Sequence, residues 1–258
     1  MSDSNQTSLV EGKVFVPASP AWIGSDRPGE GPPVQMQIRS FYIDRYPITN
    51  KQFADFLADG GYRRAELWEP DGFRWARDAG LDCPAFWDQS AYSEADQPVT
   101  GVSFYEAQAY SRWAGAQLPT EVQWEKAARG TDGRTYPWGE EEPQPRFANF
   151  APEFSPVRSA AVSVYEFPSN ESPYGCRQMA GNILEWCSDT FHFDTPACRT
   201  GIEYVEGRPG PRRLLKGGSW IAGASRLRAA ARFSFPPDFR DNITGFRTVR
   251  AVEEESDS

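Results

Sequence analysis

The chain has 258 residues, a formal net charge of −9 at pH 7 and 14% aromatic residues. This length can bury a sizeable core in one large domain, and the acidic balance argues against a nucleic-acid partner, whose phosphates would require clustered Lys and Arg. No apolar run reaches membrane-spanning length and the first residues show no signal peptide, so we expect no membrane contact and a cytoplasmic location.

The N-terminal part of the chain reads as short strands. Residues 1–12 are polar and are expected to be disordered. Lys13–Val16 and Trp22–Gly24 predict two strands divided by a proline turn, and the alternation of Gln35–Ile43 predicts a third. The segment Asp26–Pro33, rich in Gly and Pro, predicts a loop.

Three helices are predicted by a common local pattern. In each, a hydroxyl residue is followed three positions later by an acid or an amide, which is the capping box that satisfies the first free amides of a helix. A glycine then ends each helix. The pairs are Thr49 with Gln52, Ser103 with Glu106 and Thr120 with Gln123, and the glycines are Gly60, Gly115 and Gly130. Beyond Gly130 no long amphipathic helix is predicted, only short strands and long loops.

Cysteine and histidine offer little for metal chemistry. Cys83, Cys176, Cys187 and Cys198 match no zinc or redox spacing, so we expect ordinary thiols. His192 is the only histidine, and one imidazole cannot form a His-rich iron or zinc site.

The segment Lys216–Trp220 contains the adjacent glycines Gly217 and Gly218. Two glycines allow a tight turn or a close backbone approach, and here they place a hydroxyl and an indole together. Such a pair can build a site, but it can also be a plain bulge or turn in a sheet.

Several further motifs accompany this segment in a fixed order. They are Leu118–Glu121, Trp124-Glu125, Ala127–Gly130, Tyr136–Gly139, Gly181–Trp186, Lys216–Trp220, Arg228–Arg232 and Gly245–Arg247. Together they resemble the formylglycine-generating enzyme, or sulfatase-modifying factor, family. The resemblance implies an irregular α+β fold of the C-type-lectin-like kind, and it runs over residues 13–250, which we expect to form one domain. Residues 251–258 are acidic, and we expect them to form a disordered tail.

This sequence is expected to differ from the active members of the family at the copper-binding cysteines. Active formylglycine-generating enzymes hold copper with two cysteines after the Gly-Gly-Ser motif, because Cu(I) requires soft thiolates. Aligned without gaps, those positions are Ala222 and Leu227 here, so copper is not expected. Cys187 and Cys198 are the alternative thiols. Hercynine oxygenases resemble the same family but carry their iron-binding histidines in an additional N-terminal domain, so we do not expect this chain to act as one alone.

Two candidate catalytic residues and two candidate calcium sites follow from the family. Ser219 matches a serine of the oxygen pocket, and Trp186 is expected to wall that pocket, although both can also be purely structural. One structural Ca²⁺ site matches Asn182, Ile183 and Glu185, which offer the hard oxygen ligands that Ca²⁺ prefers. A second site begins at Asn149 and Phe150, but residues 156–163 lack its aspartate.

The C-terminal segment between Ser219 and Gly245 is aromatic and low in charge. If its side chains point outward, they form a ligand-binding surface; this pattern also resembles the display region of diversity-generating-retroelement variable proteins. The alternative is that Phe233 and Phe235 alternate into the core of a last hairpin. The candidate ligand-binding residues are Trp220, Ile221, Phe233, Phe235, Phe239 and Asn242.

The arginines of the motifs are expected to form ion pairs. Arg228, Arg232, Arg240 and Arg247 should pair with carboxylates such as Glu121, Glu125 and Glu185.

Two functions from different classes remain open. The first is a binding or regulatory module, with a display protein as one form, whose ligand is an unidentified protein or small molecule. The second is an oxidoreductase of the family that works without the cysteine pair on a peptide or siderophore-like substrate. We favour the first from sequence, because no residue type here activates oxygen unaided.

Overall fold

The computed structural model of the chain describes residues 11–152, 158–191 and 212–252. Most of the segments expected to be disordered, together with His192 and Cys198, lie outside these residues. Ala251, which was predicted to lie in the disordered tail, is part of a strand and pairs with Phe41.

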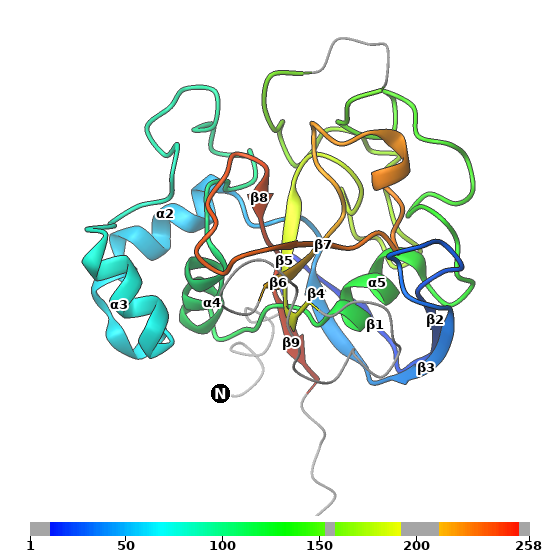
Figure 1. Cartoon of the computed structure of the whole chain (residues 1–258), viewed down its shortest axis with the longest axis horizontal. Coiled ribbons are helices and arrows are strands. Elements are labelled where there is room, and N and C mark those ends of the chain that lie inside the picture. The colour runs from blue at the N-terminus through cyan, green and yellow to red at the C-terminus, as the bar shows by residue number, and fades with distance from the viewer. Residues whose placement is uncertain (1–10, 153–157, 192–211, 253–258) are drawn as a thin grey trace, which may run out of the picture.

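Two small antiparallel sheets form the N-terminal part of the fold. β1 (Lys13–Val16) and β9 (Val249–Ala251) flank β4 (Phe41–Asp44) in one sheet, so the end of the described chain returns to its start. β2 (Ser19–Ile23) and β3 (Val34–Ile38) pair as a separate ribbon around the predicted loop. Figure 1 shows this ribbon projecting at one side of the molecule, beside β1.

The single strand predicted over residues 35–43 is wrong, because the chain forms two strands there, β3 and β4. The cause is the spacing of the buried residues. Ile38 and Phe41 are both buried but stand three positions apart, and in one continuous strand they would face opposite sides. The break at Arg39 and Ser40 lets both side chains enter the core.

The three predicted helices are confirmed, with all three capping boxes in place. They are α2 (Asn50–Ala58), α4 (Phe104–Trp113) and α5 (Glu121–Arg129). In α4 the Ser103 hydroxyl accepts from the Glu106 amide at 3.2 Å, while the Glu106 carboxylate accepts from the Ser103 amide at 2.7 Å. Local sequence alone fixes these helix starts.

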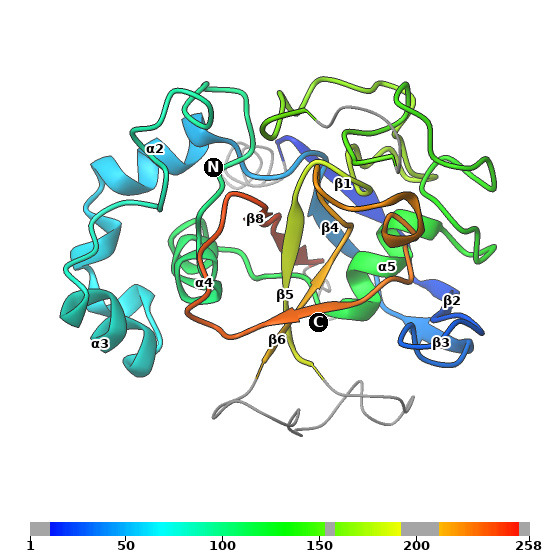
Figure 2. The same cartoon turned by 45° about the horizontal axis from the view of Figure 1, so that its top comes forward.

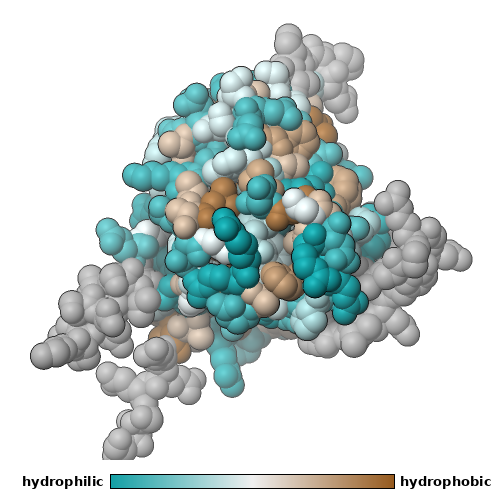
Figure 3. All heavy atoms as spheres, turned by 90° about the vertical axis from the view of Figure 1, so that its left-hand side faces the viewer, coloured by the Kyte–Doolittle hydropathy of each residue, from teal (hydrophilic) through white to brown (hydrophobic). Residues whose placement is uncertain are grey.

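A fourth helix, α3 (Pro70–Asp78), is absent from the sequence prediction. It begins at Pro70, a position where the missing amide costs nothing, and it contains Gly72. A Cβ atom at Gly72 would lie 2.7 Å from the ring of Tyr105 on α4, so glycine permits close packing of the two helices. Figure 3 views the side of α2 and α3, where hydrophilic side chains dominate and apolar ones stand in small separate groups.

The C-terminal sheet carries the double-glycine segment. Its strand order is β7 (Phe233–Phe235), β6 (Arg213–Lys216), β5 (Leu184–Thr190) and β8 (Thr244–Gly245), with only the β5–β8 pair parallel. In Figure 2, β5 and β6 run together through the middle of the molecule, between α4 and α5. The Gly217-Gly218 pair therefore leaves the end of a central strand.

The architecture confirms an irregular α+β fold. The described residues between α5 and β5 contain no helix and no strand, so loops position much of the molecule. Apolar residues gather in three clusters, one around α2 and α4, one under α5 and the first sheet, and one around Tyr136 and Phe147. No helix in the described part of the chain is both long and apolar enough to cross a membrane.

Candidate functional site

The double-glycine turn has the geometry that its sequence predicts. Gly217 and Gly218 adopt φ values of 97° and 73°, which L side chains rarely adopt. A Cβ at Gly218 would lie 2.8 Å from the Arg226 carbonyl oxygen, and one at Gly217 would lie 3.3 Å from the Trp124 ring. Both predicted uses of the pair, a turn and a close approach, are therefore confirmed.

The residue before the glycines is a fully buried lysine. Lys216 Nζ lies 2.9 Å from the Glu125 carboxylate. Arg129 Nη1 lies 2.8 Å from the other oxygen of Glu125. Burial alone would raise the pKa of Glu125, but the charges of Lys216 and Arg129 outweigh it, so this pKa is lowered. A charged cluster thus anchors β6 to α5.

A second buried pair lies beside it, between β5 and the Gly-Phe-Arg motif. Arg247 binds both carboxylate oxygens of Glu185, at 2.6 and 2.8 Å. The Trp124 indole donates to the same carboxylate at 2.7 Å. Burial disfavours the charged guanidinium, yet Glu185 outweighs this cost and raises the pKa of Arg247. We call Glu125, Arg129, Glu185, Lys216 and Arg247 the ionic framework.

The other motif arginines also form ion pairs, as predicted, but partly with unexpected partners. Arg232 Nε lies 2.8 Å from Glu121, a predicted partner. Arg240 instead pairs with Glu106 at 3.0 Å, and Arg228 pairs with Glu30 at 3.0 Å.

The two candidate catalytic residues occupy different surroundings. Trp186 is fully buried, and its indole donates to the Val102 carbonyl at 3.0 Å. It packs edge-on against Phe104 in the core, so the structure places it in the interior and not on a pocket wall. Ser219 is 2% exposed and begins the loop, where its carbonyl accepts from the Ala222 amide at 2.9 Å.

The positions of the copper cysteines belong to an apolar cluster. Leu227 is fully buried, and Ala222 packs against the same residues, which include Tyr136 and Phe147. Cys187 lies on β5, and burial raises the pKa of its thiol well above the usual value, so it stays protonated. Within the described residues no group of three or more His, Cys, Asp and Glu side chains could hold a metal ion.

The residues of the predicted calcium sites form an amide network. Asn182 donates to Gln178 at 2.7 Å and to the Val162 carbonyl at 3.0 Å, and its oxygen accepts from the Val162 amide at 2.9 Å. Asn149 donates to the Asn182 oxygen at 3.1 Å and to the Ala160 carbonyl at 3.0 Å. The network ties three loops to the double-glycine turn, because Trp220 N donates to the Asn182 carbonyl at 3.0 Å.

These residues fit calcium only in part. The carboxylate of Glu185 is held by Arg247 and Trp124, so Glu185 does not reach a calcium site in this arrangement. Ile183 and Phe150 are buried and offer only their backbone carbonyls. The Asn149 amide oxygen is buried without a hydrogen-bond partner, which makes it the one side-chain oxygen of the set that suits a cation. Calcium binding therefore stays a prediction.

The rings of the aromatic segment are neither fully outward-facing nor fully in the core, the two alternatives that the sequence leaves open. Phe233, Phe235, Phe239 and Trp220 are partly buried, and they pack against the main core cluster while keeping part of their surface accessible. Phe235 and Phe239 stack with ring centroids 4.1 Å apart. We call Trp220, Ile221, Phe233, Phe235, Phe239 and Asn242 the aromatic surface.

Asn242 is the polar member of the aromatic surface. Asn242 donates to the Tyr92 hydroxyl at 2.7 Å, and the Trp220 indole donates to the Asn242 carbonyl at 3.4 Å. Ile221, which follows Trp220 in the chain, is 51% exposed. Tyr92 had no signal in the sequence, because it lies in a loop that only the fold brings to this place.

Asp189 is a further residue that the sequence analysis did not single out. Its carboxylate accepts from the Glu121 amide at 2.6 Å, at the start of α5. Burial raises its pKa to about 6, and the nearby Glu121 carboxylate adds to this effect. Little in the sequence points to Asp189, because the start of α5 and the end of β5 come together only in the folded chain.

Comparison with known proteins identifies the family. Residues 1–252 match the model of the sulfatase-modifying factor enzyme 1-like domain. The chain belongs to the sulfatase-modifying factor family. It is 35% identical to a hercynine oxygenase of Mycolicibacterium smegmatis over 91% of this chain and 60% of that protein. It is 33% identical to a formylglycine-generating enzyme of Thermomonospora curvata over 93% of each chain.

Solved structures agree with this fold. PvdO from Pseudomonas aeruginosa superimposes with a TM-score of 0.66 at 20% identity, over 93% of this chain and 94% of that chain. Variable protein 1 of Treponema denticola gives a TM-score of 0.57 at 19% identity, over 92% and 94%. Both establish the fold alone. The chain spans only 54% to 60% of the hercynine oxygenases that it matches.

Proposed function

We propose that this chain is an oxidoreductase of the sulfatase-modifying factor family that works without the copper cysteine pair. The observation that carries the proposal is its identity of 35% with a hercynine oxygenase over 91% of its length. This favours the oxidoreductase over the binding or regulatory module that the sequence alone favoured. The kind of substrate and the kind of metal also belong to this proposal and are tested with it.

The aromatic surface is the proposed substrate side of the enzyme. Its partly buried rings offer an apolar area beside the Ser219 loop, and Trp and Phe side chains with some surface accessible are common anchors for ligands. Asn242 is held by Tyr92, which leaves its amide oxygen as an acceptor for a polar group. The ionic framework lies beneath and fixes the backbone that presents these side chains.

The metal of such an enzyme cannot be copper held in the usual way. Ala222 and Leu227 offer no ligand atoms, and Leu227 is buried in an apolar cluster. A metal centre would need ligands from another segment of the chain, placed over the aromatic surface. The described residues of this chain would then bind and orient the substrate and exclude water around it.

Oxygen consumption tests the proposal. The full chain, loaded anaerobically with Fe(II) or Cu(I), is mixed with hercynine plus a thiol, or with a peptide carrying Cys-x-Pro-x-Arg, and oxygen uptake and product mass are followed. We expect oxygen uptake above the protein-free blanks for at least one combination of metal and substrate. If no combination gives uptake while a ligand still binds to the aromatic surface, the proposal is contradicted and the binding module is favoured again.

A matched pair of variants ties the activity to the surface. Ile221→Asp places a charge in the aromatic surface and should reduce uptake at least about tenfold, since a charge buried under substrate is costly. Phe15→Asp makes a similar change at a side chain of similar exposure, 48% against 51%, on β1. Equal loss in both variants would show that the surface has no special role.

A further inference from the structure

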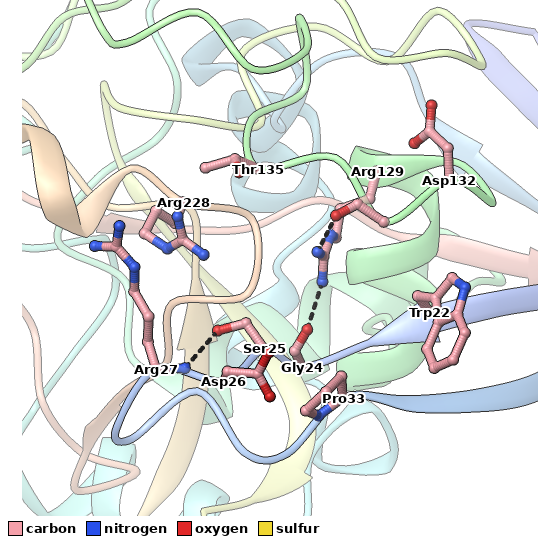
Figure 4. A pocket seen from close by; sticks show the side chains of 11 residues that line it. Trp22, Gly24, Ser25, Asp26, Arg27, Pro33, Arg129, Asp132, Thr135 and Arg228 are labelled. Carbon is pink, nitrogen blue, oxygen red and sulfur yellow. Dashed lines mark hydrogen bonds between the residues drawn. The ribbon is translucent and has the colours of Figure 1, made fainter.

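A pocket of about 510 Å³ shares no lining residue with the double-glycine turn or the aromatic surface. Its walls are the loop between β2 and β3, the residues that follow α5, and Arg228, which follows the short 3₁₀ helix Ala224–Arg226. Figure 4 shows it from close by. This volume is within the range that holds small-molecule ligands.

The β2–β3 loop is closed on itself by its own hydrogen bonds. Ser25 N donates to the Gly31 carbonyl at 2.8 Å, and Glu30 N donates to the Arg27 carbonyl at 3.2 Å. The Ser25 hydroxyl also donates to the Glu30 carboxylate. Arg27 is thus carried on a preformed turn, so binding through it would require little ordering of the backbone.

Arg228 is held in place by only one of its three nitrogens. Its residue is 9% exposed, and Nε donates to both Glu30 oxygens at 3.0 and 3.3 Å. The two terminal nitrogens have no hydrogen-bond partner among the described residues, although they belong to a largely buried side chain. Those nitrogens form the fork that suits a planar oxyanion.

Arg27 adds a second positive charge to the same end of the pocket. Its guanidinium is exposed and makes no hydrogen bond or ion pair with another described residue. Figure 4 shows the guanidinium groups of Arg27 and Arg228 on the same side. Burial raises the pKa of Tyr136 to about 12, and both arginines act against this rise, which places both charges near one hydroxyl.

Arg129 lines the pocket too, but it is fully committed to the wall. Its Nε donates to the Arg134 carbonyl and its Nη1 to the Gly24 carbonyl, both at 2.8 Å. Its Nη2 donates to the Gly133 carbonyl. The contrast with Arg27 and Arg228 is informative, because an arginine kept only for structure is satisfied in this way.

We propose that the pocket binds the carboxylate of a small molecule on Arg27 and Arg228. Asp26 and Asp132 line the same pocket, so a dianionic phosphate would meet more repulsion than a carboxylate with one charge. Trp22 lies across the pocket from the two arginines and is 42% exposed, so its ring can contact an apolar or aromatic tail of the ligand.

Calorimetric titration of the full chain at fixed ionic strength tests this site. Hippurate supplies a carboxylate and an aromatic tail, hippuramide is its uncharged analogue, and inorganic phosphate is the alternative anion. We expect hippurate to bind with one-to-one stoichiometry and hippuramide to bind at least about tenfold more weakly, since a charge-assisted bond is worth roughly 1.5–3 kcal/mol.

Variants locate the site. Arg27→Ala should weaken hippurate binding by about 10- to 100-fold, because one charge-assisted contact is lost. Arg74→Ala removes the same charge from an exposed position on α3 and should leave binding unchanged. Arg228→Lys keeps the charge but loses the fork, and its thermal melt checks that the fold survives.

Two results would overturn the proposal. Equal binding of hippurate to Arg27→Ala and Arg74→Ala would remove the site, and tighter Arg27-dependent binding of phosphate would reject the carboxylate. Neither result bears on oxygen uptake, so the proposed function stands or falls separately.

Discussion

The two sides of the Gly217-Gly218 turn differ in a way that reverses the usual distribution of side chains. On the strand side, Lys216 and Glu185 are charged and fully buried. On the loop side, Trp220 and Ile221 are large apolar residues that keep part of their surface accessible. Charged residues are almost never fully buried unless they are paired, and large rings normally fill cores.

The buried charged residues therefore hold the turn in place, while the accessible apolar residues are the part of the turn that can contact a ligand. A buried ion pair adds little net stability over an apolar replacement, but removing one partner is costly. The ionic framework therefore fixes which backbone segments meet, while changes on the aromatic surface leave that arrangement in place. One stretch of sequence can then keep its shape while its exposed side chains are free to specify a ligand.

The largest expected effect comes from breaking the framework. Glu185→Ala leaves Arg247 buried without its carboxylate and should reduce the free energy of unfolding by about 3–5 kcal/mol. Urea denaturation measures this loss. The control is Glu66→Ala, which removes an exposed carboxylate from Arg64 and should leave the midpoint unchanged. A wild-type midpoint for Glu185→Ala would mean that Arg247 is satisfied without it.

The next effect depends on pH and concerns Asp189, at the edge of the framework. Its pKa is raised from 3.8 to about 6 in the folded chain, so the wild type loses stability as pH rises from about 4 to 6. Asp189→Asn keeps the bond from the Glu121 amide without the buried charge. Relative to wild type, it should therefore gain about 2 kcal/mol between pH 4.5 and pH 7.5.

Urea denaturation of both proteins at the two pH values measures this gain. A gap between Asp189→Asn and wild type that stays the same at both pH values would show that Asp189 is charged in the folded chain throughout this range.

A smaller loss is expected from the aromatic surface. Phe235→Ala removes a partly buried ring that stacks on Phe239, and it should cost about 1–2 kcal/mol. Phe246→Ala, at a fully buried ring, should cost about 3–5 kcal/mol. Equal losses in thermal or urea unfolding would place Phe235 in the core and remove the proposed substrate side.

What the sequence could predict was local. The capping boxes need only residues three positions apart, and the glycine turn needs only the conformational freedom of Gly217 and Gly218, so both were confirmed. α3 was missed because Pro70 and Gly72 resemble a turn, while the reason for Gly72 is Tyr105 on another helix.

The candidate site was less predictable because its contacts are distant in sequence. Arg228 and its partner Glu30 stand 198 positions apart, and nothing local joins them. Glu185 shows the same limit, since its motif suggested a calcium ligand while Arg247, 62 positions away, holds its carboxylate. Glu121 and Glu185 could be named from sequence as carboxylates that pair with the motif arginines, but which arginine binds which carboxylate follows only from the assembled fold.

The smallest expected effect is that of calcium on the framework side. With Glu185 occupied, a cation would have the Asn149 oxygen and backbone carbonyls as ligands, and such a neutral set binds weakly. At a calcium concentration equal to Kd the gain is about 0.4 kcal/mol, so a chelator should barely move the melting midpoint. A drop equivalent to more than about 2 kcal/mol would require a carboxylate ligand, because tight calcium sites depend on charge. Glu185 would then turn from Arg247 to the metal, and the Glu185→Ala variant would lose its response to the chelator.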